Sequence, residues 1–391
     1  STALIALRSV VQSHSPLPIR KCIVIKKNLQ KIFKKISYLF FFQIYGKIKE
    51  IINADSDTRI KLKFNKIEED IIYKIYKIKD GRMYTDRIHD TAILLENKIV
   101  EGASFQLRGN KNESAKHNIV FEKGTPRKLK KLKGVVLSLL TGGGGNNNYW
   151  HWLYDVLPRL KLCEEIHQIK DVDYFILPSL EKKFQVETLE LLNINQNKTL
   201  SSKNFRHILS SELIVTDHPY NLTNNFHKDA QNIPIWILEW LKEKFLKNLN
   251  QPKKNYPKNI YLDRNDTKSI APQARSLTNE AEVKNLLIKK NFTFVKLNDL
   301  SFVEQVYHFY NAECVVGLHG AGFANLSFCR NGTKIIEFRT ETTGKVIENL
   351  AQKNNLEFNS IVCNVKAPDY AKQSGHVKIP LDILEQKMSE F

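Results

Sequence analysis

The sequence predicts an α/β protein with two Rossmann-like domains that face a cleft. From residue 134 onward, short apolar runs alternate with helical patterns, and a Pro- and Lys-rich stretch at 251–257 divides this alternation in two. Strands that are joined through helices lie parallel, with right-handed crossovers. A chain of 391 residues is long enough for two such domains. Ligands of such sheets bind outside the carboxyl ends of the strands, so we expect the functional residues to lie there.

The predicted elements fall into three parts, residues 1–50, 51–250 and 251–391. In the first two parts, strands are predicted at 91–95, 98–100, 134–140, 174–177 and 213–215, and helices from Tyr149, over 181–192 and over 234–249. In the third part, strands are predicted at 260–262, 294–297, 314–316 and 334–338, with helices at 279–289, 301–311 and 346–354.

The first 50 residues differ from the rest in pattern. Residues 1–20 show no periodicity and are expected to form a disordered leader. Residues 20–50 carry nine Lys or Arg and one Glu, interleaved with Ile, Leu and Phe. This pattern fits peripheral contact with an anionic membrane, and it fits a solvated helix at the domain edge equally well.

Composition narrows the class of partner. The net charge of +19 favours an anionic partner, which could be nucleic acid, a lipid head group or a nucleotide diphosphate. No RNA-binding, zinc-finger or helix-turn-helix signature occurs, which argues against nucleic acid. Five cysteines without a C-x-x-C pair argue against a zinc site or a disulfide framework and favour a reducing, cytoplasmic location. No apolar run approaches the roughly 20 residues of a membrane span, and no secretory signal is visible.

The strongest motif joins the predicted strand at 314–316 to a helix that begins near Phe323. It reads Gly317-Leu318-His319-Gly320-Ala321-Gly322. Glycines at a strand end allow a sharp turn and close backbone approach to a ligand. The following helix would direct its free N–H groups at an anion, and His319 adds a side-chain donor. A tight turn with a capping histidine is the structural alternative.

Three further residues in the same part strengthen this interpretation. Glu337 lies on the next strand, at the carboxyl end where dinucleotide folds place an acidic residue that binds ribose. Arg264 follows the strand at 260–262, and Arg275 precedes the helix at 279–289. Arginine is favoured where a diphosphate needs forked, permanently charged donors. Together with the glycine turn, these residues predict a diphosphate site.

The candidate catalytic pair lies in the second part. His151 and Asp155 are four residues apart and share one face of the predicted helix. A histidine beside a carboxylate can act as a general base near neutral pH, and Asp155 itself is an alternative base. Trp150 and Trp152 are candidate rings for packing against an acceptor. A helix start with a structurally satisfied histidine is the alternative interpretation. Pro158 is expected to end or kink the helix, and the preceding run of four glycines is interpreted as a connector.

No metal ligand is predicted. Two D-x-D sequences occur, Asp55-Ser56-Asp57 and Asp171-Val172-Asp173. The second precedes its strand, whereas a metal-binding pair belongs after one, and the first is expected to form a turn. A departing diphosphate would then be neutralised by arginines and by the helix end.

These motifs together resemble glycosyltransferase family 61, including its bacterial capsular-polysaccharide members. The resemblance covers about residues 80–391, and its motifs occur in the family's order. It does not extend to residues 1–50, and the four-glycine insert is unusual for the family. The matching stretches are Asn148–Arg159, Tyr261–Glu282, Phe302–Gln305 and Val316–Phe338.

The resemblance implies a GT-B fold and inverting transfer of a sugar from a nucleotide-sugar, usually UDP-linked, to a glycan or lipid-linked glycan. The nucleotide-sugar is a co-substrate, and no cofactor is expected. Residues 51–250 would form the acceptor side, and 251–391 the donor domain. A protein O-glycosyltransferase of the same fold and a basic nucleic-acid-binding protein are the alternatives. A NAD-dependent enzyme is disfavoured because no G-x-G-x-x-G follows the first strand of either half. The donor-binding residues that the resemblance implies are Arg264, Arg275, His319, Gly320, Gly322, Asn325 and Glu337, and Gly317 joins them as part of the turn.

Overall fold

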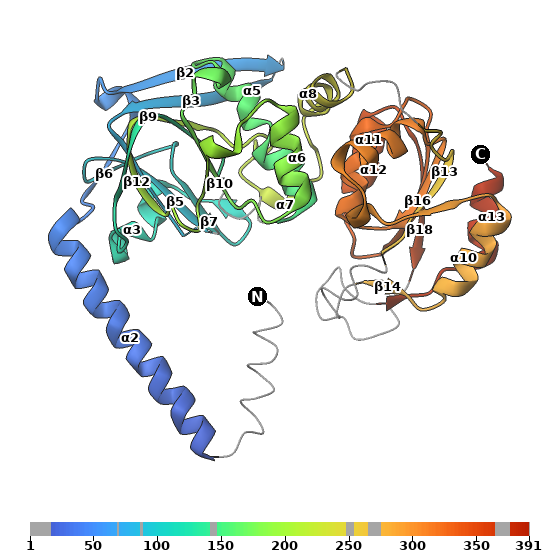
Figure 1. The fold of residues 1–391 in the computed structure, drawn as a ribbon, viewed down its shortest axis with the longest axis horizontal. Coiled ribbons are helices and arrows are strands. Elements are labelled where there is room, and N and C mark those ends of the chain that lie inside the picture. The colour runs from blue at the N-terminus through green and yellow to red at the C-terminus, as the bar shows by residue number, and fades with distance from the viewer. Residues whose placement is uncertain are drawn as a thin grey trace.

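The computed structural model describes residues 17–68, 70–86, 89–140, 147–247, 254–264, 275–363 and 376–390. Within these ranges the chain forms a mixed α/β fold with a 12-stranded sheet, a 5-stranded sheet and a 2-stranded sheet. The two larger sheets belong to two bodies that lie side by side, the first built from residues before 248 and the second from residues after 253 (Figure 1).

The chain begins with helix α2 (Leu17–Tyr45), which extends away from the first body (Figure 1). It contains most of the predicted basic segment, and residues 1–16 of the predicted leader lie outside the described residues. Within the described ranges, no helix combines the length and apolar character that crossing a membrane requires.

The 12-stranded sheet is mixed. Its strands are β1 (Glu50–Ile52), β2 (Ile60–Glu68), β3 (Ile71–Lys79), β4 (Gly81–Thr85), β5 (Asp90–Leu95), β6 (Lys98–Val100), β7 (Phe105–Arg108), β8 (Lys111–Asn112), β9 (Lys130–Ser138), β10 (Tyr174–Leu177), β11 (Thr199–Ser201) and β12 (His207–Thr216). Strands β12, β9, β10 and β11 are neighbours and run parallel, whereas β3 and β4 pair with β12 antiparallel.

The prediction of parallel strands in this half is therefore confirmed for only part of the sheet. The reason lies in the short connections from β4 to β5 and from β5 to β6, since loops this short can join only antiparallel neighbours. Glu96, with φ of 53°, lies in the second of these loops. Asp80 has the same φ but interrupts one extended segment, because β3 and β4 both pair antiparallel with β12 on either side of it. The predicted strand pair at 91–95 and 98–100 is confirmed as the antiparallel hairpin β5–β6.

Helices of the first body follow the predicted order, although the segment after Asn148 is not one regular helix. A π-helical turn, η3, interrupts it, and Pro158 immediately precedes α5. The segment after Asn148 consists of α4 (Tyr149–His151), η3 (Trp152–Val156) and α5 (Arg159–Glu164), and the longer helices are α6 (Lys183–Leu191) and α8 (Ile235–Phe245). Short helical turns are η1 (Ala54–Ser56), η2 (Ala115–His117), α3 (Val120–Lys123), η4 (Ile169–Asp171), η5 (Gln196–Lys198) and α7 (Phe226–Asp229).

The 5-stranded sheet is parallel throughout, as predicted. Its spatial order is β15-β13-β16-β17-β18, so the chain order reverses between β13 and β16. This arrangement is a doubly wound sheet, whose ligands bind where the order reverses. Its elements are β13 (Asn259–Leu262), α10 (Glu280–Lys289), β15 (Thr293–Val295), η6 (Leu297–Asp299), α11 (Phe302–Asn311), β16 (Cys314–Leu318), η7 (Ala321–Phe328), β17 (Lys334–Thr340), α12 (Val346–Lys353), β18 (Glu357–Cys363) and α13 (Leu381–Ser389). Strands β14 (Ser276–Leu277) and β19 (His376–Val377) pair separately.

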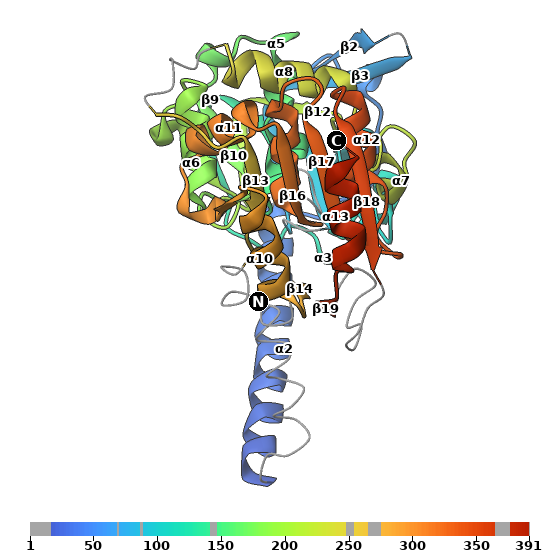
Figure 2. The ribbon, with the colours of Figure 1, turned by 90° about the vertical axis from the view of Figure 1, so that its right-hand side faces the viewer.

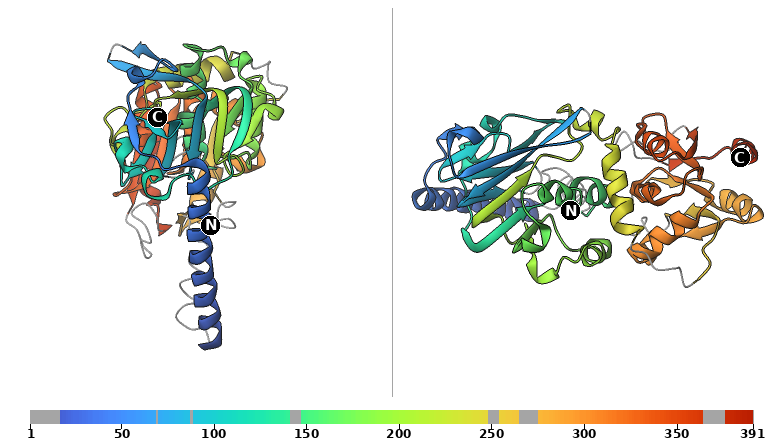
Figure 3. Two further views of the ribbon diagram at one scale, coloured as in Figure 1. Left: turned by 90° about the vertical axis from the view of Figure 1, so that its left-hand side faces the viewer. Right: turned by 90° about the horizontal axis from the view of Figure 1, so that it is seen from above.

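Helices cover both faces of this sheet. α10 and α13 lie on the face turned to the viewer in Figure 2 and pack through Val283, Leu287 and Leu384. On the other face, a buried apolar cluster continues into the first body and contains Trp152 together with Phe302 and Phe328. Helix α8 lies between the two bodies in the view from above (Figure 3). Because buried apolar side chains of both bodies share one cluster, packing holds the bodies together.

Candidate active site

The glycine motif forms the turn between β16 and η7. Leu318 is the last residue of β16, and η7 starts at Ala321. A Cβ atom on Gly320 would lie 2.7 Å from Nη1 of Arg264, so a larger residue would displace that guanidinium. The close approach that the motif predicts is therefore present, and Arg264 makes it.

Two guanidinium groups meet at this turn. Nη1 of Arg264 donates a hydrogen bond to the carbonyl oxygen of His319 at 2.6 Å, and Nη1 of Arg275 donates to the same oxygen at 2.9 Å. Burial and the charge of Arg264 lower the pKa of Arg275 to about 10. Two like charges held this close in a partly buried place repel each other and favour an anion beside them.

His319 is held by a second group. Its Nδ1 atom is hydrogen-bonded to Oε1 of Glu337, which lies on the neighbouring strand β17 and is fully buried. In the register of β16 with β17, Glu337 is opposite Gly317. The carboxylate orients the imidazole and leaves Nε2 as the ring nitrogen that does not contact Glu337. The structure therefore places Glu337 behind His319, within the core.

A cavity of about 300 Å³ lies at the carboxyl ends of β13 and β16, where the strand order reverses. Both bodies contribute to its walls. From the first body come Asn147, Asn148, Tyr149, Lys182 and Phe184, and from the second Leu262, Asp263, Arg264, Leu297, Asn298, Gln305, Leu318, Gly320, Ala321, Gly322 and Phe323. The predicted residues Arg264, Gly320 and Gly322 thus face an open space of a size that suits a small ligand.

Buried polar contacts tie the helical segment of His151 to η7. The hydroxyl of Tyr149 donates to Oδ1 of Asn325 at 2.6 Å, and the hydroxyl of Tyr154 donates to the carbonyl of Ala324 at 2.9 Å. Asn325 is fully buried and donates to Gln305 as well. It therefore joins the two bodies behind the cavity wall. Removing either hydroxyl would leave a buried acceptor without its donor.

The predicted pair His151 and Asp155 is in contact. Nδ1 of His151 donates to Oδ2 of Asp155 at 2.8 Å, and this carboxylate is 1% exposed whereas the imidazole is 35% exposed. Such a hydrogen bond places the imidazole proton on Nδ1 and the lone pair on Nε2. Asp155 lies within the π-helical turn η3, a distortion that is frequent at functional sites.

His218, which the sequence analysis missed, completes this cluster. Its Nε2 atom lies 3.6 Å from Oδ2 of Asp155, while its Nδ1 atom accepts from the backbone N–H of Tyr220 and Asn221. Nδ1 is therefore unprotonated, and the ring proton on Nε2 points toward the carboxylate. Tyr220 adds a contact of 3.4 Å from its hydroxyl to Nδ1 of His151. In the sequence, His218 could have been found because Asp217-His218 directly follows β12, and polar residues at the carboxyl end of a strand are candidates for a site.

The pKa directions follow from this arrangement. Burial tends to lower the pKa of His151, but the charge of Asp155 and its hydrogen bond outweigh burial, so the net shift is upward from 6.5. Burial works against ionisation of Asp155, yet both histidines stabilise its charge, and its pKa is far below its usual range. Burial lowers the pKa of His218. Asp155 is therefore ionised and His218 neutral at pH 7.

The two predicted tryptophans have different surroundings. Trp152 is fully buried, and its Nε1 donates to Oγ1 of Thr188 at 2.8 Å. It belongs to the core and, at 0% exposed, has no free ring surface for packing against an acceptor. Trp150 is 8% exposed and packs against the ring of Tyr154.

The two D-x-D sequences lie away from these clusters. Asp57 pairs with Arg59 after η1, and Asp173 accepts from the backbone N–H of Val135 at the start of β10. In the ranges that the structure describes, no three His, Cys, Asp or Glu side chains are grouped so that they could hold a metal ion.

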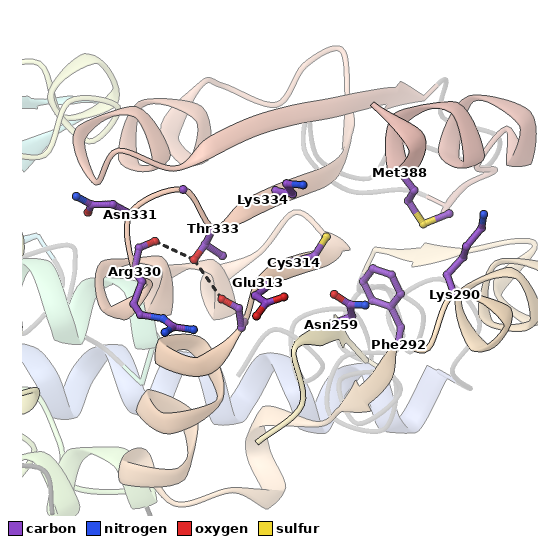
Figure 4. A pocket seen from close by; sticks show the side chains of 12 residues that line it. Asn259, Lys290, Phe292, Glu313, Cys314, Arg330, Asn331, Thr333, Lys334 and Met388 are labelled. Atoms are coloured by element: carbon purple, nitrogen blue, oxygen red, sulfur yellow. Dashed lines mark hydrogen bonds between the residues drawn. The ribbon is translucent and has the colours of Figure 1, made fainter. Parts of the chain in front are cut away.

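A second cavity, of about 550 Å³, lies at the opposite end of the second sheet (Figure 4). Its walls include Asn259, Cys314 and Lys334, the first residues of β13, β16 and β17. Because ligands of parallel sheets bind at the carboxyl ends of strands, size alone does not make this cavity the active site.

A comparison with protein families identifies a domain in this chain. The model of the family described as Glycosyltransferase 61 matches residues 149–336, a range that contains both the His151 cluster and the arginine cluster. No curated protein has a sequence that matches this chain significantly. The chain therefore carries a glycosyltransferase family 61 domain, and it is a glycosyltransferase.

Proposed function

We propose that this glycosyltransferase moves a sugar, with inversion, from a UDP-sugar to a hydroxyl of a glycan or lipid-linked glycan in polysaccharide biosynthesis. The observation that carries the proposal is the convergence of Arg264 and Arg275 on the carbonyl of His319, at the point where the order of the second sheet reverses. Two bodies around one cavity also suit the GT-B arrangement that the family resemblance implies.

The diphosphate of the donor would bind between the two guanidinium groups and the turn at Gly320. The carbonyl oxygen of His319 accepts a hydrogen bond from each arginine. Both guanidinium groups are therefore already positioned before a ligand binds. A dianion relieves their mutual repulsion and gains charge-assisted hydrogen bonds. Gly320 allows the backbone this close approach to Arg264, whereas Gly317 and Gly322 let the turn pack against Leu262 and Leu297. His319, oriented by Glu337, adds a donor through Nε2 for charge that develops on the leaving group.

The acceptor would be activated by His151. Nε2 takes the proton of the acceptor hydroxyl while its oxygen bonds to the anomeric carbon, and the bond from that carbon to the diphosphate oxygen breaks. The electron pair leaves with the nucleoside diphosphate, and the proton stays on the imidazole. Asp155 stabilises the imidazolium. Burial and a depressed pKa make Asp155 the orienting group, since a carboxylate that is 1% exposed cannot reach an acceptor.

The remaining predicted residues would position the groups that contact the donor and the acceptor. Glu337 and Asn325 are fully buried, so we assign them to positioning His319 and the start of η7. Trp150 precedes His151 in the chain and is 8% exposed, against 0% for Trp152, so it remains the candidate ring for the acceptor side. No metal is required in this scheme, because two guanidinium groups already offset the charge of the leaving diphosphate.

A thermal-shift screen against UDP, GDP, CMP and dTDP tests the donor assignment. A nucleotide at a hundred times its dissociation constant should stabilise the protein by about 2.7 kcal/mol. UDP is expected to give the largest shift in the wild-type protein and a smaller one in Arg264→Lys. The proposal fails if no nucleotide shifts the melting temperature, and preference for GDP, CMP or dTDP would refute the UDP assignment alone.

A further inference from the structure

Helix α2 carries an uncovered apolar face. Seven large apolar side chains on it are 54–73% exposed, and their spacing of three and four residues puts them on a single stripe. A contiguous apolar surface of this kind marks an interaction site. We call these residues the α2 stripe: Leu29, Ile32, Phe33, Ile36, Leu39, Phe40 and Ile44.

The last turns of α2 attach it to the first body. The hydroxyl of Tyr45 accepts from the backbone N–H of Leu129, and its ring packs against His207. Phe42 lies close to Gly124. These residues are on the side of the helix opposite the stripe, and the helix extends away from the body in Figures 1 and 2 and in the left view of Figure 3.

The charge of α2 identifies what could cover the stripe. Its sequence contains no Asp or Glu, so a second copy of the helix would bring only like charges to its partner. An anionic lipid surface is complementary to that charge, and lysine-rich amphipathic helices lie in the plane of such surfaces. The basic residues of α2 are Arg20, Lys21, Lys26, Lys27, Lys31, Lys34 and Lys35.

A basic cavity of about 430 Å³ adjoins the stripe. It lies between α2 and the body, and Phe33 belongs both to the stripe and to its wall. Four cationic side chains and one carboxylate, that of Asp86, line this cavity. An anionic lipid head group could therefore enter it while the acyl chains of the lipid cover the stripe. The cationic residues are Lys34, Lys123, Arg127 and Arg206.

We propose that α2 lies on the surface of an anionic lipid bilayer, with its stripe at the boundary of head groups and acyl chains. The adjoining cavity then holds the phosphate of an anionic lipid. This placement does not depend on the donor site. It would hold the protein at the surface where a lipid-linked acceptor resides.

Sedimentation with vesicles tests the proposal. The wild-type chain should bind vesicles of equal parts phosphatidylcholine and phosphatidylglycerol, and should bind pure phosphatidylcholine at least tenfold more weakly. Ile36→Ser combined with Phe40→Ser should weaken binding to the anionic vesicles about tenfold or more. Ile288→Ser, which changes an equally exposed isoleucine of α10, is the matched control and should bind as wild type. Equal binding of all variants would overturn the proposal.

The cavity is tested by Lys34→Glu and Lys123→Glu, with the exposed Lys116→Glu as control. The first two variants should lose several-fold more affinity for anionic vesicles than the control. If inorganic phosphate at millimolar concentration abolishes vesicle binding of the wild type, the cavity takes free anions and the lipid assignment is wrong. A stable dimer that the Ile36→Ser and Phe40→Ser changes dissociate would assign the stripe to a second copy instead. Far-ultraviolet circular dichroism and nucleotide binding verify that each variant is folded.

Discussion

Nδ1 of His151 and Oδ2 of Asp155 lie 2.8 Å apart, with the carboxylate buried and the imidazole partly exposed. This difference in exposure separates their roles, because only the imidazole can reach a substrate. It also makes the pair a unit in which one residue orients the other.

Replacing either member of this pair should therefore impair transfer. His151→Ala should lower kcat by roughly 10²- to 10⁴-fold, the usual contribution of a general base. Asp155→Asn should cost a similar factor, since an amide can hold the imidazole in the wrong tautomer. His227→Ala, at an exposed histidine, is the control and should act as wild type. Nucleotide release with a sugar acceptor measures these rates, and near-normal turnover of both variants would remove the pair from catalysis.

The pH dependence of kcat/KM should also reflect the contact between His151 and Asp155. His151 acts as a base in its neutral form, and Asp155 raises its pKa above 6.5, so kcat/KM should fall as the pH falls through that raised pKa. In Asp155→Asn the carboxylate is gone, and burial then lowers the pKa of His151. The acid limb of the residual activity should move to lower pH. A limb that stays in place would mean that another group titrates.

Most strands and helices of the second body could be predicted from the sequence. Its strands β13, β15, β16 and β17 are short apolar runs, separated by helices whose amphipathic pattern is clear, so periodicity finds them. β18 and α13 were not predicted, because β18 has alternating exposure along a partly polar run and α13 buries a single side chain, that of Leu384, which gives a weak apolar period. Arg264, Arg275 and His319 meet because parallel strand ends share one edge.

The first body was harder to predict. Strands β2 and β3 are rich in Lys and Ile and form an antiparallel hairpin with each other, and neither was predicted. The pairing of β3 with β12 joins residues more than 130 positions apart, which periodicity does not encode. His218 reaches Asp155 only through the pairing of β12 with β9, across many intervening residues. Burial of Trp152 and Glu337 likewise depends on tertiary packing.

The arginine cluster should control affinity for the nucleotide. Arg264→Lys and Arg275→Lys keep the charge and lose the forked donors that meet at His319. A charge-assisted hydrogen bond contributes about 1.5–3 kcal/mol, which corresponds to roughly tenfold to hundredfold weaker binding of the nucleoside diphosphate. Arg330→Lys, at an exposed arginine that lines the cavity of about 550 Å³ at the other end of the sheet, is the matched control. Isothermal titration measures the affinities, and unchanged values for both variants would place the diphosphate elsewhere.

The polar contacts between the two bodies should contribute to the free energy of unfolding. Tyr154→Phe removes the hydroxyl that binds the carbonyl of Ala324 and Oγ of Ser327, all buried. Leaving these acceptors without a partner should lower the free energy of unfolding by roughly 1–3 kcal/mol. Tyr310→Phe alters an exposed tyrosine and should change it by less than about 0.5 kcal/mol. Urea denaturation followed by tryptophan fluorescence compares them, and equal midpoints would contradict the structural role.

Chelation separates arginine-based from metal-based handling of the leaving group. A divalent ion would supply two positive charges to the departing diphosphate, and Arg264 and Arg275 supply the same number at the carbonyl of His319. Transfer by the wild-type enzyme should therefore persist in excess EDTA, with kcat/KM within about twofold of its value in magnesium. Loss of activity that manganese restores would contradict this expectation. Asp55→Asn and Asp171→Asn would then identify the carboxylate involved, since an arginine-based mechanism leaves both variants fully active.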